Sequence, residues 1–404
     1  MAKDVICPYC FERFELSTAW WRCSSNGCRS LETNQQLEPD EEYTRYIAEV
    51  SGTPPQQVLS RPHKFPRPQF KRGVGNLFAQ PNDAVAFCDW CGTVTGNRIC
   101  PFCHNDLPWA VDSLDNQILA VVGGPAAGKS HYIAVLIEQG RKVFGPNFNI
   151  AFDALNDATR KRFAQEFKEP LYQKHRQIDK TQQAPAVEPL MYRIHIQPKG
   201  GRERGMTLVF FDTAGENFQS VNELSLYARY VRHASAIILL VDPLQMEPIR
   251  EKLKGAPLNL PQNPMEPSDI ISRLTQQFQQ FGGQKATDKI KVPIAVSFTK
   301  IDVLRDYDII DSGGALFTAP PHEQGFRTET GRQIHDDVQS LISRYDGQEI
   351  QTLLSHYFTR YQYFGVSALG HAPALDGTLG TVSPFRVEDP LLWCLSEIGF
   401  LQKR

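Results

Sequence analysis

Residues 123–130 read GGPAAGKS and are the strongest indication of the fold of this chain. This stretch satisfies G-x-x-x-x-G-K-[ST], follows the strand-like run at 117–122 and opens a helical pattern that continues to about Phe144. In this context, loop N–H groups surround a phosphate, and the helix N-terminus favours its negative charge. Lys129 is expected to reach the β- and γ-phosphates, and Ser130 to bind Mg²⁺. The stretch therefore predicts a phosphate-binding loop.

Strands and helices alternate along the chain after this loop. Apolar runs at 235–241, 292–298 and 363–366 predict strands, and the runs 191–197 and 206–212 predict a hairpin. This alternation predicts an α/β fold, the three-layer P-loop NTPase fold with a mainly parallel sheet. Extra length at 149–178, 243–286 and 303–361 is expected to form insertions, the last two of them helical.

Three further motifs follow the phosphate loop in order. Asp212-Thr213-Ala214-Gly215, Thr299-Lys300-Ile301-Asp302 and Ser367-Ala368 each come just after a predicted strand. Open α/β sheets bind their ligands at the carboxyl ends of the strands. These motifs are therefore expected to gather around one ligand.

This set of motifs resembles the TRAFAC-class P-loop GTPases over nearly all of residues 111–404. The resemblance implies that Asp302 accepts hydrogen bonds from guanine N1 and N2, that Lys300 packs along the base, and that Ala368 donates its N–H to guanine O6. Thr299 stands where asparagine is commoner. Adenine would leave the Asp302 carboxylate unpaired, so we expect GTP and GDP as ligands.

The residues expected to contact the nucleotide come from the phosphate loop and from the three motifs after it. They are Gly123, Gly124, Pro125, Ala126, Ala127, Gly128, Lys129, Ser130, His131, Asp212, Gly215, Thr299, Lys300, Asp302, Ser367, Ala368 and Leu369. Mg²⁺ is expected at Ser130, Asp212 and Thr181. Thr181 is chosen because the threonine that closes over the γ-phosphate and Mg²⁺ must lie between the first helix and the hairpin. Thr159 is the less suitable alternative, since it falls in a predicted helix.

Glu216 separates two interpretations of the nucleotide site. It follows Gly215 where many hydrolytic switches carry a water-positioning glutamine, and a carboxylate near the γ-phosphate repels it. Lys129, Gly215 and Glu216 are the expected catalytic residues. Slow intrinsic turnover, stimulated by a partner or by self-association, is the prediction. The alternative is an adaptor that binds guanine nucleotide without hydrolysing it.

The first 110 residues contain eight of the nine cysteines. Cys7, Cys10, Cys23 and Cys28 are expected to form one four-cysteine zinc site, and Cys88, Cys91, Cys100 and Cys103 a zinc ribbon. Both zinc ions are expected to be structural, because four thiolates leave no open position for water. His104 is expected to be a solvated neighbour, and Cys394 a buried residue of a C-terminal helix.

The predicted domains are a first zinc module at 1–38, a proline-rich connector at 39–84, a zinc ribbon at 85–110 and the GTPase domain at 111–404. The connector is expected to be extended or irregular over 51–82, after a short helix at 40–50. It contains basic and aromatic residues that could contact nucleic acid, although a solvated linker is favoured: Arg61, His63, Lys64, Phe65, Arg67, Phe70, Lys71 and Arg72.

Composition and charge favour a soluble protein. Net charge is −2, and no apolar run approaches the ~18 residues of a membrane helix. MAKDVICPYC lacks the apolar core of a signal peptide, so a cytoplasmic location is expected.

A cysteine-rich head, residues 1–110, that precedes a long GTPase domain resembles the bacterial double-GTPase families. That resemblance implies a role in conflict or defence systems, with a companion GTPase or another protein effector as partner. Homo-oligomerisation and an RNA-associated function stay open as alternatives.

Overall fold

The computed structural model describes residues 3–25, 27–66, 85–109, 111, 115–178, 189–196, 204–210, 221–262, 264–281, 288–345 and 347–404. The chain divides into two compact units, the first built mainly from residues 1–116 and the second mainly from residues 117–404. Among the described residues, none of the helices combines the length and the apolar character needed to cross a membrane.

Among the described residues, the first unit contains short strands, helix α1 (Glu41–Ser51) and most of α6 (Val221–Arg232). β3 (Trp20–Arg22) is the central strand of a three-stranded antiparallel sheet with β4 (Lys64–Phe65) and β7 (Arg98–Ile99). Two antiparallel pairs accompany it: β1 (Asp4–Ile6) with β2 (Arg13–Glu15), and β5 (Ala86–Phe87) with β6 (Val94–Thr95). β8 (Asp115–Asn116) ends the unit.

Helix α1 (Glu41–Ser51) confirms the short helix expected at 40–50. The Asp40 side chain accepts the Tyr43 N–H at its start, and Gly52 ends it in the left-handed region with φ of 65°. Within the predicted connector, Lys64–Phe65 is extended and pairs with β3, and Phe65 is buried, so the solvated-linker interpretation is wrong at this position. The apolar Phe65 side chain packs near Trp21, which makes this stretch part of the unit's core.

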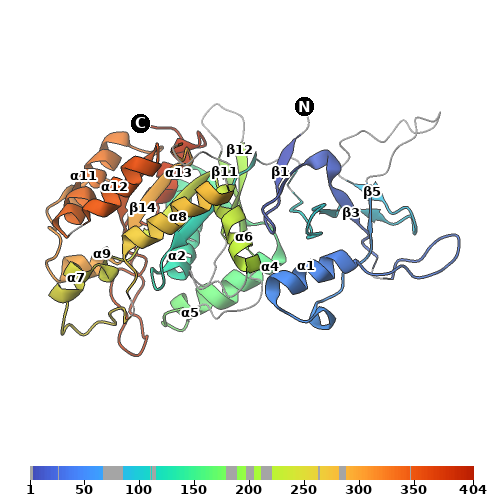
Figure 1. Cartoon of the computed structure of the whole chain (residues 1–404), viewed down its shortest axis with the longest axis horizontal. Helices are drawn as coiled ribbons and strands as arrows, with labels where there is room; N and C mark the ends of the chain where they lie inside the picture. The colour runs from blue at the N-terminus through green and yellow to red at the C-terminus, as the bar shows by residue number, and fades with distance from the viewer. Residues whose placement is uncertain are drawn as a thin grey trace. The chain divides into compact units, whose positions relative to one another are not determined.

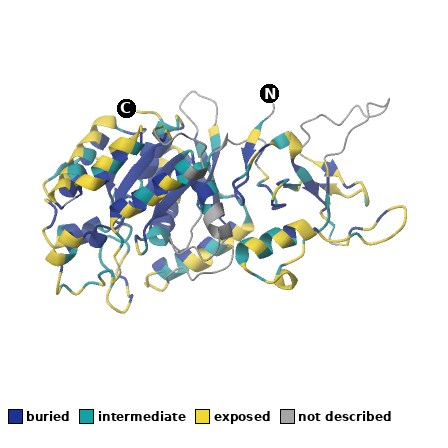
Figure 2. Ribbon diagram, in the orientation of Figure 1, coloured by how far each residue is buried: buried dark blue, intermediate teal, exposed yellow. Residues whose placement is uncertain are grey.

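The second unit is built on a parallel sheet in the order β15–β14–β13–β9. Figure 1 labels its strand β14 among the helices of the unit. Its strands are β9 (Leu119–Gly123), β13 (Ala236–Val241), β14 (Ile294–Phe298) and β15 (Tyr361–Gly365). Every residue of β9, β13 and β14 is buried, as expected for a sheet covered on both faces (Figure 2). The predicted α/β fold with a parallel sheet is confirmed.

An antiparallel meander belongs to the same unit. β11 (Leu190–Ile196) and β12 (Arg204–Phe210) form the predicted hairpin, with Leu190 opposite Phe210. β10 (Ile150–Ala154) pairs with β11 and lies in the region expected to be an insertion, so this strand is an addition to the predicted elements. Its alternating buried and exposed residues are the signal that could have identified it.

Helices surround the parallel sheet. α2 (Lys129–Lys142) and α13 (Asp389–Glu397) share one large apolar core with the strands, and Cys394 is fully buried in it, as predicted. The other described helices of this unit are α3 (Phe144–Phe148), α4 (Asp157–Arg162), α5 (Glu169–Tyr172), α7 (Glu247–Lys252), α8 (Pro267–Phe281), α9 (Ile301–Asp306), α10 (Ala315–Thr318), α11 (Thr328–Arg344) and α12 (Gln348–Tyr357). The insertions at 243–286 and 303–361, predicted to be helical, contain α7 and α8 and the helices α10 to α12, respectively.

Candidate functional site

The phosphate loop lies between β9 and α2. Lys129 folds back over it, with its Nζ 2.8 Å from the Gly123 carbonyl and 3.4 Å from that of Gly124. Gly128 has φ of 83° and Ala126 φ of 58°, so the backbone turns through the left-handed region twice. This conformation favours glycine at position 128. A Cβ on Gly123 would lie 2.5 Å from the Leu240 carbonyl, so that residue must also be small.

The TKID motif follows β14 and begins α9. The Thr299 N–H bonds the Val241 carbonyl at 2.8 Å, and Lys300 has φ of 54°. The Lys300 Nζ lies 2.6 Å from an Asp242 carboxylate oxygen. Asp302 is 5% exposed, and burial raises its pKa, although a hydrogen bond with the Ser367 side chain opposes the rise.

The Ser367 loop follows β15, the neighbour of β14. Ser367 exchanges two backbone hydrogen bonds with Phe385, and its Oγ accepts the Gly370 N–H at 2.8 Å. Through its contact with Asp302, Ser367 brings two of the predicted motifs together. Ala368 and Leu369 are partly buried against the main core.

His131 occupies the third position of α2. Its Nε2 accepts the Ile178 N–H at 3.1 Å, which requires an unprotonated Nε2. Burial, followed by the charge of Lys300, lowers the His131 pKa to about 4. The neutral imidazole therefore fixes the backbone at Ile178 by this hydrogen bond, and Thr181 follows three residues later.

Several predicted site residues lie outside the described part of the chain: Thr181, Asp212, Gly215 and Glu216. Thr159, the alternative Mg²⁺ ligand, is described. It is buried in α4, and its Oγ1 accepts the Met191 N–H at 3.2 Å. Its hydroxyl thus fastens α4 to β11.

Sequence reasoning missed two buried polar residues beside the nucleotide loops. Asp242 pairs with Lys300, and Gln245 donates a hydrogen bond to the Pro125 carbonyl at 3.1 Å. They are 2% and 3% exposed. The available signal was the polar DPLQ stretch directly after the apolar strand AIILLV.

The eight head cysteines form two groups, but not the predicted ones. An outer four-cysteine group contains Cys7, Cys10, Cys100 and Cys103, and an inner four-cysteine group contains Cys23, Cys28, Cys88 and Cys91. In both groups, Sγ pairs between the early and the late cysteines lie 3.6 to 3.7 Å apart. Four thiolates at 2.3 Å from a tetrahedral zinc lie about 3.8 Å apart. Each group could therefore hold a zinc ion.

The prediction of two contiguous quartets is wrong, and the register of the head sheet gives the reason. β3 and β7 are antiparallel, with Trp20 opposite Ile99. Extending this register places Cys100 opposite Ala19, four residues from Cys23, or about 13 Å along the ladder. The Cys10 Sγ lies 3.7 Å from the Cys100 Sγ, so Cys10 is at the Cys100 end of the sheet and cannot share an ion with Cys23, as a contiguous quartet would require.

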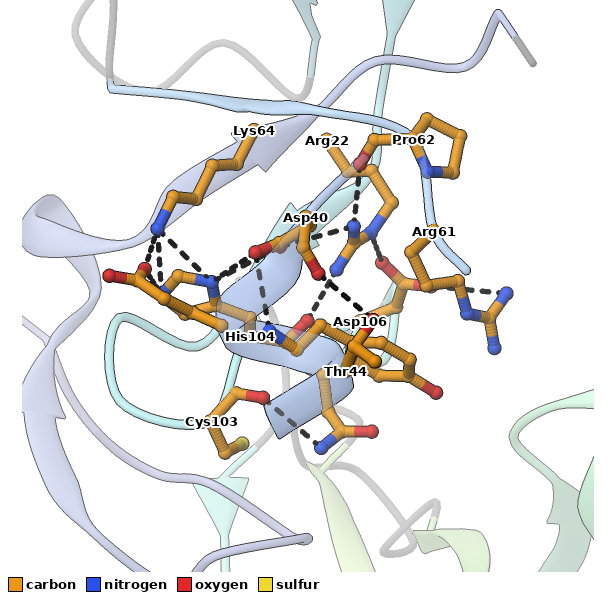
Figure 3. Close-up of polar contacts among 12 residues, drawn as sticks. Arg22, Asp40, Thr44, Arg61, Pro62, Lys64, Cys103, His104 and Asp106 are labelled. Carbon is orange, nitrogen blue, oxygen red and sulfur yellow. Dashed lines mark hydrogen bonds and ion pairs between the residues drawn. The ribbon is translucent and has the colours of Figure 1, made fainter. Parts of the chain in front are cut away.

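A buried charge network lies beside Cys103 (Figure 3). The His104 Nδ1 lies 2.9 Å from an Asp40 carboxylate oxygen, and Arg22 donates to Asp40 at 3.3 Å. Lys64 contacts both His104 and Glu42. Asp40, Glu42 and His104 lie close enough to hold a metal, but Arg22 and Lys64 already supply the positive charge.

This network corrects the expectation for His104, which is 4% exposed and hydrogen-bonded rather than solvated. Its carbonyl also accepts a hydrogen bond from Arg22. The ring and the carbonyl therefore tie the turn after Cys103 to β3 and to the start of α1.

A protein-family model and a curated relative match this chain over most of its length. The Double-GTPase 2 family model matches residues 117–360. A curated protein of Mycolicibacterium smegmatis, named "Putative ESX-1 scaffolding and assembly protein SaeC", is 30% identical over 324 residues, which cover 75% of this chain and 80% of that protein.

Among solved structures, the Arl6 BBS3 small GTPase from Trypanosoma brucei with bound GppNp is 12% identical. The match has a TM-score of 0.29 and covers 70% of this chain and 98% of that one. The family match spans more than half of the chain and confirms the resemblance to the double-GTPase families noted in the sequence. The chain belongs to the Double-GTPase 2 family.

Proposed function

We propose that this GTP-binding protein hydrolyses GTP slowly to GDP and phosphate, as a switch stimulated by a partner or by self-association. One observation carries the proposal. The phosphate loop after β9 and the buried Asp302 after β14 share one edge of a parallel sheet. Two strand spacings, about 10 Å, separate these strands. A nucleotide with its phosphates at Lys129 and its base at Asp302 bridges that span.

The chain's own groups supply most of what phosphoryl transfer needs, which is positioning and charge stabilisation. Lys129 would neutralise phosphate charge, and Ser130 would hold Mg²⁺ together with Thr181 and Asp212. The bound Mg²⁺ would add positive charge between the phosphates. The Gly215 amide would contact the γ-phosphate, with Glu216 beside it.

Guanine specificity follows from the buried carboxylate of Asp302. Its two oxygens would accept the N1 and N2 hydrogens of guanine, with Lys300 along the base and the Ala368 N–H at O6. Adenine offers no such pair of donors and would leave a charged group buried and unpaired. His131 and Leu369 complete the proposed contacts from the two ends of the site.

Glu216 is the reason for proposing slow turnover. A glutamate can accept a hydrogen bond from an attacking water, but when ionised it cannot donate one to the transition state. Single-turnover GTP hydrolysis by the wild type, Glu216→Ala and Lys129→Ala tests this. We expect slow hydrolysis by the wild type and loss of tight GTP binding in Lys129→Ala. Tight binding without any hydrolysis in wild type or Glu216→Ala would contradict the enzyme proposal.

That outcome would favour the second candidate, a nucleotide-bound adaptor. The relative's name describes scaffolding and assembly, which favours a protein effector or companion GTPase as the partner. Nucleic acid is the less favoured partner, since Phe65 is buried and Lys64 is paired with Glu42. The role in conflict or defence systems and the cytoplasmic location stay predictions from the resemblance and the sequence.

We further propose one structural zinc ion in each four-cysteine group. The Sγ spacing fits a tetrahedral ion, and the cysteines are not joined by disulfides. Separate apolar clusters surround the outer and inner groups. The head, residues 1–110, would thus be a single zinc-stabilised module placed before the GTPase domain at 111–404.

A further inference from the structure

Gln245 connects two segments that are far apart in sequence. Its Nε2 donates to the Pro125 carbonyl at 3.1 Å, and its Oε1 accepts the Met265 N–H at 3.0 Å. The side chain is buried, with 3% of the residue exposed. The buried amide therefore makes two hydrogen bonds to the backbone, one to the phosphate loop and one to the segment that leads into α8.

The bond to Pro125 orients a peptide of the phosphate loop. The Pro125 carbonyl and the Ala126 N–H belong to one planar trans peptide, in which the two groups point in opposite directions. Holding the carbonyl toward Gln245 therefore turns the Ala126 N–H to the opposite side. Ala126 has φ of 58°, which is unfavourable for a residue with a Cβ, so this conformation needs support from its neighbours.

Neighbouring contacts reinforce this arrangement. The Ile270 side chain of α8 packs on Gly124, where a Cβ would lie only 2.6 Å from the Ile270 Cδ1. Asp242, three residues before Gln245, pairs with Lys300. The turn after β13 thus contacts the phosphate loop at one end and the TKID motif at the other.

We propose that Gln245 is a positioning residue for phosphate binding. It holds the Pro125–Ala126 peptide so that the Ala126 N–H faces the phosphates of the bound nucleotide. Through Met265, the same side chain ties the segment before α8 to the loop. This inference rests on the proposed function, because it requires a nucleotide at this loop.

Gln245→Ala removes the amide and tests the proposal. We expect GDP and GTP to bind about tenfold more weakly, the effect of losing one well-placed hydrogen-bonding arrangement. Preference for GTP over ATP should stay unchanged, because Asp302 is untouched. Thr275→Val is the matched control: Thr275 is also buried, on α8, and its hydroxyl donates to the Ser272 carbonyl, away from the phosphate loop. Titration calorimetry with GDP and thermal unfolding are measured for each variant.

Gln245→Glu adds a second measurement, the pH dependence of GDP affinity, which a purely structural role of Gln245 would not change. An ionised carboxylate cannot donate to the Pro125 carbonyl, whereas a protonated one can. The affinity of Gln245→Glu for GDP should therefore recover toward the wild-type value as the pH falls from about 8 to about 5, through the range in which a buried carboxyl takes up its proton. Wild-type affinity measured over the same range corrects for other titrating groups.

The outcomes are distinguishable. Tenfold weaker binding by Gln245→Ala, with pH-dependent recovery in Gln245→Glu, supports the proposal. Unchanged affinity in Gln245→Ala overturns it while leaving guanine-nucleotide binding intact. An equal loss of affinity in Thr275→Val also overturns it, since the cause would be general destabilisation. A wild-type protein that binds no guanine nucleotide would overturn both this inference and the proposed function.

Discussion

Paired cysteine substitutions would distinguish two arrangements of the zinc ligands. In the nested arrangement of the structure, the first and last cysteine pairs would share one ion and the two middle pairs would share the other. In the contiguous arrangement, the first four cysteines would share one ion and the last four would share the other. Cys7→Ser with Cys103→Ser removes two ligands of the outer four-cysteine group and leaves the inner four-cysteine group complete. Contiguous quartets would each lose one ligand instead. The nested arrangement therefore predicts one zinc ion retained per chain, and the contiguous arrangement predicts none.

The geometry sets the strength of this prediction. Sγ atoms that share a zinc ion lie about 3.8 Å apart. The β3–β7 register separates Cys23 from Cys100 by four residues, or about 13 Å, and the Cys10 Sγ lies 3.7 Å from the Cys100 Sγ. Cys10 and Cys23, which a contiguous quartet would join, therefore lie on opposite sides of that gap. No side-chain rotation closes that gap, so exchange of ligands between the groups would require the sheet to break. Because each structural zinc contributes on the order of 10 kcal/mol of apparent binding free energy, an intact group should keep its ion.

Zinc per chain is counted by native mass spectrometry and by elemental analysis. The reciprocal variant, Cys7→Ser with Cys23→Ser, damages both nested groups and should retain no zinc in a complete site. Cys394→Ser is the control, because Cys394 is buried in α13 and belongs to neither group; it should retain two ions. Retention of one ion by the reciprocal variant, with none in the Cys7→Ser, Cys103→Ser variant, would refute the nested grouping.

Two further predictions concern the second unit. Asp302→Ala should abolish the preference for GTP over ATP in competition binding while the phosphate loop stays intact, and unchanged discrimination would contradict the base-site assignment. Burial, followed by the charge of Asp389, raises the pKa of Glu388 from 4.5 to about 7. The folded state then binds more protons than the unfolded state, so this group's contribution to stability falls as the pH rises between these values. Glu388→Gln should therefore unfold at a higher temperature than the wild type at about pH 8, with a smaller difference at about pH 5; an equal difference at both would contradict the buried-carboxyl explanation.

Much of the GTPase unit could be predicted because its information is local. The strand AIILLV at 236–241 is apolar throughout, and the phosphate loop follows a strand and opens a helix. Such patterns depend on residues a few positions apart, so a contiguous stretch contains them. The hairpin of β11 and β12 and the buried Cys394 helix could be predicted for the same reason.

Residue types and motif spacing were enough to identify which residues have the chemistry for phosphate, guanine and zinc. How these residues combine is visible in the folded chain alone: which cysteines share a group, where His104 lies, and that Gln245 and Asp242 contact the nucleotide loops. The physical reason is that strand pairing and register set these contacts. Cys10 and Cys100 are 90 residues apart in the chain, yet their Sγ atoms lie 3.7 Å apart once the sheet has formed.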